Sequence, residues 1–575
     1  MLFVIISNIF GVLPAQVIRI AFDLVTENIS VYQLFSGFQR QALIYEIFGS
    51  SLLLFAAIVM ILALLRGMFL FFMRQTLILM SRHIEYDLKN ELYNHYQKLS
   101  LSFFRRNNTG DLMNRATEDV SRVRMYLGPG IMYSINTIVL FIMVIYAMLT
   151  VNVRLAIYSI LPLPVLVVMI WYVNNIINYR SEKIQQRLSA LSSFVQENFS
   201  GIRVIKSYVR EGFVRESFAA ESENYKAHSM ALVKVQALFY PLMLLLVGLS
   251  NVIVIYVGGI EVMKGNITSG NIAEFIVYLN QLTFPVIALG WVTSLIQRAA
   301  ASQKRINEFL KEQPEIKSPR YVTKKTLNGK LEFENVSFTY PDTGIKALKN
   351  ISFTAKPGEM VAIIGRTGSG KSTIANLLMR MYDCTSGDVL VDGNSIKELN
   401  LESYRSQTGI VPQEVFLFSD TIANNIAFSS DKLDMPAVEQ AAKDAAVYHS
   451  IMEFEEGFET LVGERGITLS GGQKQRVSIA RALIKHPKIL IFDDCLSAVD
   501  TRTEEEILNN LGRNMIGKTT IIIAHRISTI KNADKILVLD HGEIIEQGTH
   551  DVLMQKRSVY FELYEKQLLE EEESV

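Results

Sequence analysis

Long apolar runs in the first half of the chain are the feature that most limits its possible folds. Five strongly apolar runs lie at about 51–73, 131–150, 155–173, 237–258 and 272–296, and a weaker run at about 2–22 contains Gln16 and Arg19. A helix that crosses a bilayer needs roughly 20 mostly apolar residues. A buried helix of a soluble protein can imitate one such run but hardly five. The sequence therefore predicts an α-helical membrane domain over residues 1–310 with six transmembrane helices.

The basic residues between the apolar runs indicate how these helices are oriented. Lys and Arg gather in two long connections, whereas the other connections hold little beyond Arg40, Arg154 and Lys264. Because cytoplasmic loops carry the excess of Lys and Arg, we expect both long connections and both ends of the domain in the cytoplasm of a cell-membrane protein. The length and composition of these connections predict that the helices continue beyond the bilayer.

Polar side chains inside the apolar runs are candidates to line a central cavity, because polar groups are costly in hydrocarbon. The alternative is hydrogen bonding between helices, or snorkelling of the one arginine toward the inner leaflet. The candidate residues are Arg66, Glu274, Asn280, Gln281 and Gln297, with Tyr240 and Trp291 as aromatic walls.

Charge becomes frequent after about residue 303, which marks a change of domain. Residues 311–330 are expected to be a linker, residues 331–567 a second domain, and residues 568–575 an acidic tail. The chain has 57 basic and 57 acidic residues, so its charge gives no support for a nucleic-acid partner, and its two cysteines form no disulfide framework. The N-terminus lacks the features of a cleavable signal peptide, so either the apolar run starts abruptly or residues upstream are missing.

The segment MVAIIGRTGSGKST, residues 360–373, predicts a phosphate-binding loop between a strand and a helix. Its glycines let backbone N–H groups surround phosphate oxygens at the positive end of the helix. Lys371 would reach the β- and γ-phosphates, and the Ser372 hydroxyl would bind Mg²⁺. The alternative is a flexible glycine loop without a ligand. The expected ATP-binding residues are Gly365, Arg366, Thr367, Gly368, Ser369, Gly370, Lys371, Ser372 and Thr373.

The segment ILIFDD, residues 489–494, predicts a buried parallel strand that ends in two carboxylates. Ligands of open α/β sheets bind at the carboxyl ends of the strands. Asp493 is therefore expected to be the acidic partner of Mg²⁺ in phosphoryl transfer. Asp494 is the candidate base or water-positioning group.

The segment LSGGQ predicts a second phosphate-binding helix N-terminus, with Ser470 at the cap and Gly471, Gly472 and Gln473 after it. One nucleotide cannot easily use two such termini of the same subunit. We therefore expect the nucleotide to be shared between two subunits.

These motifs, with IIIAHR at residues 521–526, resemble those of ATP-binding cassette (ABC) exporters over essentially the whole chain. The resemblance implies a half-transporter, with six transmembrane helices fused to one α/β P-loop domain that binds ATP and Mg²⁺. It implies that Tyr340 stacks on adenine, that Gln413 senses Mg²⁺ and the attacking water, and that His525 is the switch histidine. Taken alone, each of these three residues would more often be a core or surface residue.

The same resemblance implies how the two domains communicate. Short coupling helices are expected within residues 103–123 and 207–218, the second contacting the partner subunit; the alternative is a pair of solvated amphipathic turns. Ser470, Gly471, Gly472 and Gln473 would contact the γ-phosphate bound by the opposite subunit. Residues 462–466 resemble the loop that senses the membrane helices, and residues 497–500 the loop that crosses the dimer interface.

Asp494 departs from the family pattern, which usually has Glu at this position. The shorter side chain withdraws the carboxylate by roughly 1 Å, and a misplacement of that size can cost about 10²-fold in rate. The family includes heterodimers in which one ATP site is degenerate. The intact LSGGQ favours a heterodimer in which this chain supplies the weaker site, whereas the intact His525 keeps a homodimer with two slow sites open.

The function expected from these features is ATP-driven export of an amphipathic solute (a drug, lipid or peptide) by alternating access. The alternative class is a regulatory or channel-like membrane protein in which ATP gates conformation without pumping. A soluble DNA-repair or translation ATPase is excluded if the apolar runs span a bilayer.

Overall fold

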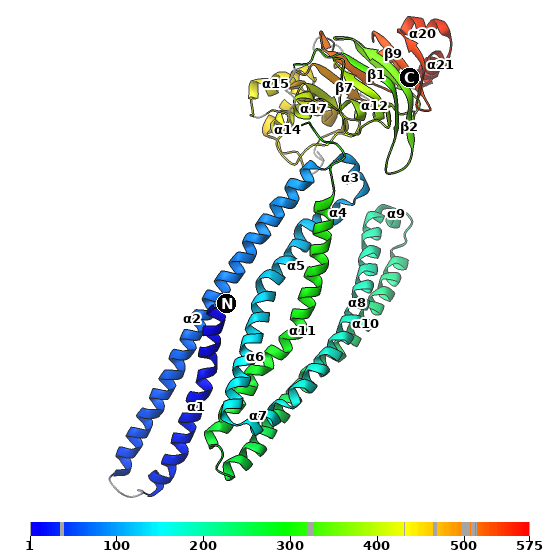
Figure 1. The fold of residues 1–575 in the computed structure, drawn as a ribbon. Coiled ribbons are helices and arrows are strands. Elements are labelled where there is room, and N and C mark those ends of the chain that lie inside the picture. The colour runs from blue at the N-terminus through cyan, green and yellow to red at the C-terminus, as the bar shows by residue number, and fades with distance from the viewer. Residues whose placement is uncertain are drawn as a thin grey trace. The chain divides into compact units, whose positions relative to one another are not determined.

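The computed structural model describes residues 2–34, 40–319, 326–430, 432–463, 469–495, 507, 512 and 515–573. The chain divides into two compact units (Figure 1). One unit comprises Met1–His95 and Leu112–Lys311, and the other comprises Tyr96–Asp111 and Glu312–Val575.

Long helices make up the first unit. Six of its helical stretches are long and apolar enough to cross a membrane: Leu2–Ile29, Tyr45–Lys98, Thr109–Val151, Val153–Ser200, Glu211–Met263 and Ser269–Lys311. Each of the six predicted apolar runs lies inside one of these stretches. The five longer ones have 43 to 54 residues. At about 1.5 Å per residue they exceed the roughly 30 Å hydrocarbon core of a bilayer, as the long basic connections predicted.

Helix labels follow the chain. The first unit contains α1 (Leu2–Leu34), α2 (Arg40–Lys98) as far as His95, α4 (Thr109–Asn114) from Leu112 onward, the π-helical turns η1 (Arg115–Asp119) and η2 (Tyr126–Gly130) around α5 (Val120–Met125), α6 (Ile131–Val151), α7 (Val153–Ile160), α8 (Pro162–Ser200), α9 (Ile202–Ser207), α10 (Glu211–Met263) and α11 (Ser269–Lys311). Its apolar core joins α1, α6, α8, α10 and α11 through residues such as Val144 and Phe275.

Two of the polar residues expected to line a cavity instead join helices. Glu274 is fully buried and accepts hydrogen bonds from Arg19 of α1 (3.5 Å) and from Tyr278 (2.9 Å). Gln281 donates to the carbonyl oxygen of Gly11 at 2.9 Å. Asn280, Gln297, Tyr240 and Trp291 are exposed on the surface of this unit.

A short helix lies at each of the two turns between long helices where coupling helices were expected, but its bounds differ from the ranges 103–123 and 207–218, and a coupling role stays a prediction. At the first turn, α3 (Leu101–Arg106) is the separate short helix, and residues from Thr109 onward already belong to the next long helical stretch. At the second turn the short helix is α9, which ends at Ser207, the first residue of the predicted range 207–218. Val209, with φ at 51°, interrupts the helix there, and α10 begins at Glu211.

The second unit contains two sheets. Strands β1 (Leu331–Thr339), β2 (Lys346–Ala355), β4 (Ser386–Val391) and β5 (Asn394–Ser395) form an antiparallel sheet in the order β2-β1-β4-β5. The larger sheet has the order β10-β9-β3-β8-β7-β6, in which only β10 runs antiparallel. Its strands are β3 (Met360–Gly365), β6 (Thr408–Val411), β7 (Ile489–Asp493), β8 (Thr519–Ile523), β9 (Lys535–Asp540) and β10 (Glu543–Gly548).

The larger sheet separates two hydrophobic cores. Alternate residues of β3 show this, since Val361 and Ile363 pack in one core and Ala362 and Ile364 in the other. Side chains of a strand alternate between the two faces, and both faces here are covered, so the central parallel strands are continuously apolar. The helices are α12 (Lys371–Leu378), α13 (Leu401–Ser406), α14 (Ile422–Ala427), α15 (Met435–Asp444), α16 (Tyr448–Met452), η3 (Gly457–Glu459), α17 (Gly471–Leu483), α19 (Ile527–Ile530), α20 (His550–Lys556) and α21 (Val559–Glu573).

Candidate nucleotide site

The loop between β3 and α12 has the backbone geometry of a phosphate-binding loop. Gly368 and Gly370 have φ angles of 81° and 102°, in the left-handed region that favours glycine. A Cβ atom on Gly370 would also lie 2.5 Å from the carbonyl oxygen of Ala347. Glycine is therefore required at this position both by the backbone angle and by the close approach of β2.

Lys371 places a buried cation at the base of this loop. Its ammonium group donates to the carbonyl oxygens of Gly365 (2.8 Å) and Arg366 (3.0 Å). Burial lowers the pKa of Lys371, and the nearby Asp494 and Asp493 partly offset this effect. The ammonium is thus held by two backbone oxygens and lies close to two carboxylates.

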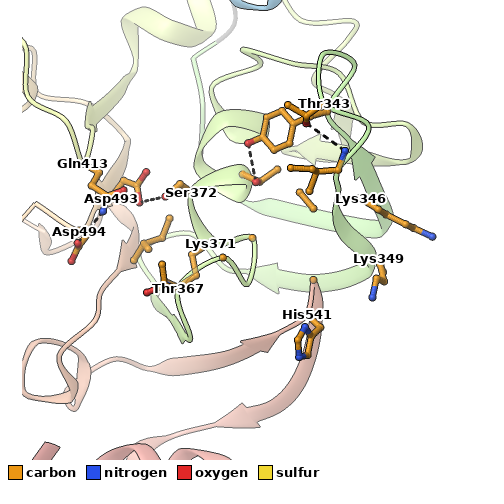
Figure 2. A pocket seen from close by; sticks show the side chains of 18 of the residues that line it. Thr343, Lys346, Lys349, Thr367, Lys371, Ser372, Gln413, Asp493, Asp494 and His541 are labelled. Carbon is orange, nitrogen blue, oxygen red and sulfur yellow. Dashed lines mark hydrogen bonds between the residues drawn. The ribbon is translucent and has the colours of Figure 1, made fainter. Parts of the chain in front are cut away.

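A cavity of about 500 Å³ lies against the loop (Figure 2). Eleven of the residues that the sequence predicted for the site line it: Tyr340, Thr367, Gly368, Gly370, Lys371, Ser372, Thr373, Gln413, Asp493, Asp494 and His525. Gly365 and Arg366 instead contribute the carbonyl oxygens that hold Lys371, and Ser369 is buried inside the loop.

Asp493 connects β7 to the loop. It is the last residue of the strand and is 7% exposed, and its carboxylate accepts a hydrogen bond from the Ser372 hydroxyl at 2.9 Å (Figure 2). Burial is the main cause that raises its pKa, against the opposing effects of Ser372 and Lys371. A carboxylate and a hydroxyl at this distance are the hard oxygen donors that Mg²⁺ prefers.

Three polar side chains meet at the rim of the cavity. The amide nitrogen of Gln413 donates to Asp494 Oδ2 at 3.3 Å, and His525 Nε2 lies 4.0 Å from the same oxygen. Asp494 has φ at 48°, a conformation that Asp and Asn tolerate better than most residues. The pKa of His525 is lowered, first by burial and then by Lys371, while Asp494 acts in the opposite direction. A carboxylate, an amide and a neutral imidazole can together orient a water molecule.

Tyr340 also lines the cavity and is held by several contacts. Its hydroxyl is 3.0 Å from Thr373 Oγ1, and its ring meets Phe338 and Tyr382 edge to face. The guanidinium of Arg105, from α3, lies 5.1 Å from the centre of the Tyr340 ring. These contacts hold the ring in one orientation.

The signature segment caps α17. The Ser470 hydroxyl accepts from the amide of Gln473 at 3.3 Å, and the Gln473 side chain accepts from the amide of Ser470 at 2.9 Å. This reciprocal capping box explains why a helix begins directly after the serine. Within the described part of the chain, Ser470, Gly471, Gly472 and Gln473 do not line the cavity of Lys371. Their action on a second subunit's nucleotide stays a prediction.

Several residues that line the cavity were not predicted. Arg105, Thr343, Ile345, Lys346, Ala347, Lys349, Ile523, His541 and Gly542 also line the cavity. Two of them lie in segments that the sequence singled out for other reasons: Ile523 stands in IIIAHR, and Arg105 lies in the range 103–123. The others lie at strand ends or in turns and belong to no motif, so the sequence gave no signal for them. Residues 497–500 and 464–466 lie outside the described residues.

Comparisons with known proteins agree with this geometry. Residues 1–286 match the family described as ABC transporter transmembrane region, and residues 348–497 match the family described as ABC transporter. The chain is 38% identical over 491 residues to the multidrug resistance-like ATP-binding protein MdlA of Escherichia coli, covering 85% of this chain and 83% of that protein.

Two further similarities cover most of the chain. It is 36% identical over 514 residues to the ATP-dependent lipid A-core flippase of Syntrophus aciditrophicus, covering 89% of this chain and 85% of that protein. The structure of a bacterial Atm1-family ABC exporter with ATP bound superimposes with a TM-score of 0.76 at 29% identity, covering 98% of both chains.

Proposed function

The chain belongs to the ABC transporter family, and from this premise we propose that it exports an amphipathic solute as one half of a heterodimer and contributes the weaker ATP site. Membership in the family makes it a multi-pass membrane protein whose cytoplasmic domain couples ATP hydrolysis to transport. The observation that carries the proposal is the cavity in which Lys371, Asp493 and Asp494 meet, on a chain with six membrane-crossing helices.

The class of solute follows from the named relatives. One is called multidrug resistance-like and another is called a lipid A-core flippase. Drugs and lipids share an apolar body with a polar group. The exposed Trp291, Tyr240, Asn280 and Gln297 offer side chains of both kinds. We therefore propose a drug, lipid or peptide of this amphipathic type.

The cavity fits ATP with Mg²⁺. Ser372, Asp493 and Gln413 would hold the ion, which supplies charge neutralisation for the phosphates. The backbone N–H groups of residues 367–370 and the start of α12 would surround the β- and γ-phosphates, and the Lys371 ammonium would exchange its carbonyl partners for phosphate oxygens. Tyr340 would stack on adenine, and Asp494, Gln413 and His525 would orient the attacking water.

The proposal of a heterodimer rests on a difference between two motifs of this chain. Asp494 carries a short carboxylate where a longer one would lie closer to the attacking water. By contrast, the signature helix has a complete capping box and can serve the ATP held by another subunit. A partner that carries Glu at the equivalent position would then perform most of the hydrolysis.

A homodimer with two slow sites is the second candidate, and a specific observation favours it. Gln413 Nε2 and His525 Nε2 still lie 3.3 and 4.0 Å from Asp494 Oδ2. A site without hydrolysis does not need this arrangement. An ATP-gated, channel-like protein is the alternative to a pump in either assembly.

The test is the ATPase activity of the purified chain alone in lipid, compared with its Asp494→Glu and Asp494→Asn variants. If Asp494 is a short base, the chain alone turns over slowly and Asp494→Glu is faster by up to about 10²-fold. Fast hydrolysis by the unaltered chain, abolished in Asp494→Asn, would contradict the weak site and favour the homodimer. Mass measurement of the complex isolated from its own membranes then identifies one subunit or two.

A further inference from the structure

The C-terminal helix α21 contacts the backbone of the loop that carries His525. The amide nitrogen of Gln567 donates to the carbonyl oxygen of His525 at 2.6 Å. The side-chain oxygen of the same Gln567 accepts from the backbone N–H of Ile527 at 2.8 Å. The Gln567 side chain thus makes hydrogen bonds to the backbone on both sides of Arg526, the residue that follows His525.

This double contact meets a structural need of the loop. Ile527 opens the short helix α19, and the first amides of a helix have no partner within it. Gln567 supplies the missing acceptor from another element. It also satisfies the carbonyl of His525, so the backbone next to the imidazole is fixed at a donor and at an acceptor.

Helix α21 is itself firmly attached to the domain. Tyr560 is fully buried in the core that contains Ile527 and Ile530, and Leu563 and Tyr564 pack against the same core. Residues 560, 563, 564 and 567 have the i, i+3, i+4, i+7 spacing of one helix face, so the face that packs in the core also carries Gln567.

The start of the helix is held as well. The carboxylate of Glu546, which is 9% exposed on β10, accepts from the amides of Val559 (2.9 Å) and Tyr560 (3.3 Å). The Tyr560 hydroxyl lies 2.8 Å from His550 Nδ1. Because α21 is anchored at Val559 and Tyr560, the position of Gln567, two turns later, is fixed next to the His525 loop.

We propose that Gln567 is a positioning residue for His525, through which the C-terminal helix controls the rate of ATP hydrolysis. Gln567 lies outside the cavity lining and touches no expected ligand, so it acts on the imidazole only through the loop backbone. The inference rests on the proposed function, because it presumes that His525 orients the reacting groups. It adds a residue and a helix that the ATP-binding motifs do not contain.

The experiment compares steady-state ATP hydrolysis by the full-length chain in lipid with that of Gln567→Met. Methionine keeps the length and apolar packing of the side chain but makes neither hydrogen bond. We expect kcat to fall by about 5- to 20-fold, as for a small misplacement of a catalytic group, and KM for ATP to change less than about twofold. Radiolabelled ATP makes slow turnover measurable. Glu565→Ala, an exposed change on the same helix, is the matched control and keeps the parent rate.

A second background separates positioning from general damage. If Gln567 acts through His525, then Gln567→Met has no further effect on kcat in a His525→Ala protein. A loss that multiplies in the double variant, a raised KM with a lowered thermal midpoint, or an unchanged kcat overturns the inference. If His525→Ala itself keeps the parent activity, the proposed role of His525 fails instead, so the two failures are distinguishable.

Discussion

Among single residues, His525 is the one whose proposed role depends most directly on its charge state. Its imidazole is partly buried, lies 4.0 Å from Asp494 Oδ2 and feels the positive charge of Lys371. Burial and Lys371 favour the neutral ring, and Asp494 favours the charged ring. The net result is a pKa below the ordinary value of 6.5. His525 is therefore mainly neutral at physiological pH and can accept a hydrogen bond from water or donate one to phosphate.

The predicted pH dependence follows from this direction. A lowered pKa means that the neutral form of His525 is the major form at pH 6.5 and becomes the minor form only at a lower pH. We expect kcat for ATP hydrolysis to decline as the pH falls, with the midpoint of the decline below pH 6.5, because the midpoint reports the lowered pKa of His525. Measuring kcat against pH for the parent and for His525→Gln checks this. A decline whose midpoint lies above pH 6.5, or one that survives unchanged in His525→Gln, would contradict the assignment.

Among the elements, α3 is the short helix whose contacts favour a direct effect on the nucleotide. Arg105 lies over the Tyr340 ring, donates to the Tyr382 hydroxyl at 3.3 Å and lies 3.8 Å from Asp342. Arg106 pairs with Glu315 at 2.8 Å, which the Ser102 hydroxyl also contacts. One arginine of the helix therefore contacts the predicted adenine-binding tyrosine, and its neighbour contacts the segment after α11.

We expect Arg105→Ala to raise KM for ATP by about two- to fivefold, since cation–π pairs at partly exposed sites contribute about 0.5–1 kcal/mol and Tyr340 would lose part of its fixed orientation. Arg106→Ala is the matched control, because this residue is the next one on the same helix and does not line the cavity. ATP titrations of hydrolysis measure both values. Equal changes in the two variants would mean that α3 acts only as a structural support.

The same elements show what can be predicted from sequence and what cannot. The strand that ends at Asp493, the loop around Lys371 and the helix after Ser470 are local patterns in which spacing and composition determine the structure, and all three form as expected. Arg105 and Gln567 are different. Arg105 contacts Tyr340, more than 200 positions away, and Gln567 contacts His525, more than 40 positions away. Such contacts depend on tertiary packing, for which a single sequence contains no periodic signal. Gly128 is similar, because a Cβ atom there would lie 2.6 Å from Ser81 Oγ. No sequence motif predicts this close approach.

At the scale of the whole molecule, the question is whether hydrolysis in one unit drives movement of a solute through the other. The membrane unit exposes apolar side chains such as Leu53, Leu64 and Phe71 on α2, and the second unit carries the nucleotide cavity. Large exposed apolar surfaces are typical of contact with lipid, so we expect a bilayer to cover these side chains of the first unit. Transport is therefore measurable only on the full chain in membranes, together with any partner subunit isolated with it.

Lys371→Ala is the change that separates a pump from an ATP-gated channel. The variant loses the buried ammonium that would bind the β- and γ-phosphates, so inverted vesicles should lose all ATP-dependent concentration of a fluorescent amphipathic probe. Lys432→Ala, an exposed lysine outside the cavity, is the control and should transport normally. A channel would behave differently: the probe would equilibrate without being concentrated, and a non-hydrolysable ATP analogue would support its passage as well as ATP does. Concentration of the probe that requires hydrolysis and disappears with Lys371 would establish the pump, because only an energy source can hold a solute above its equilibrium distribution.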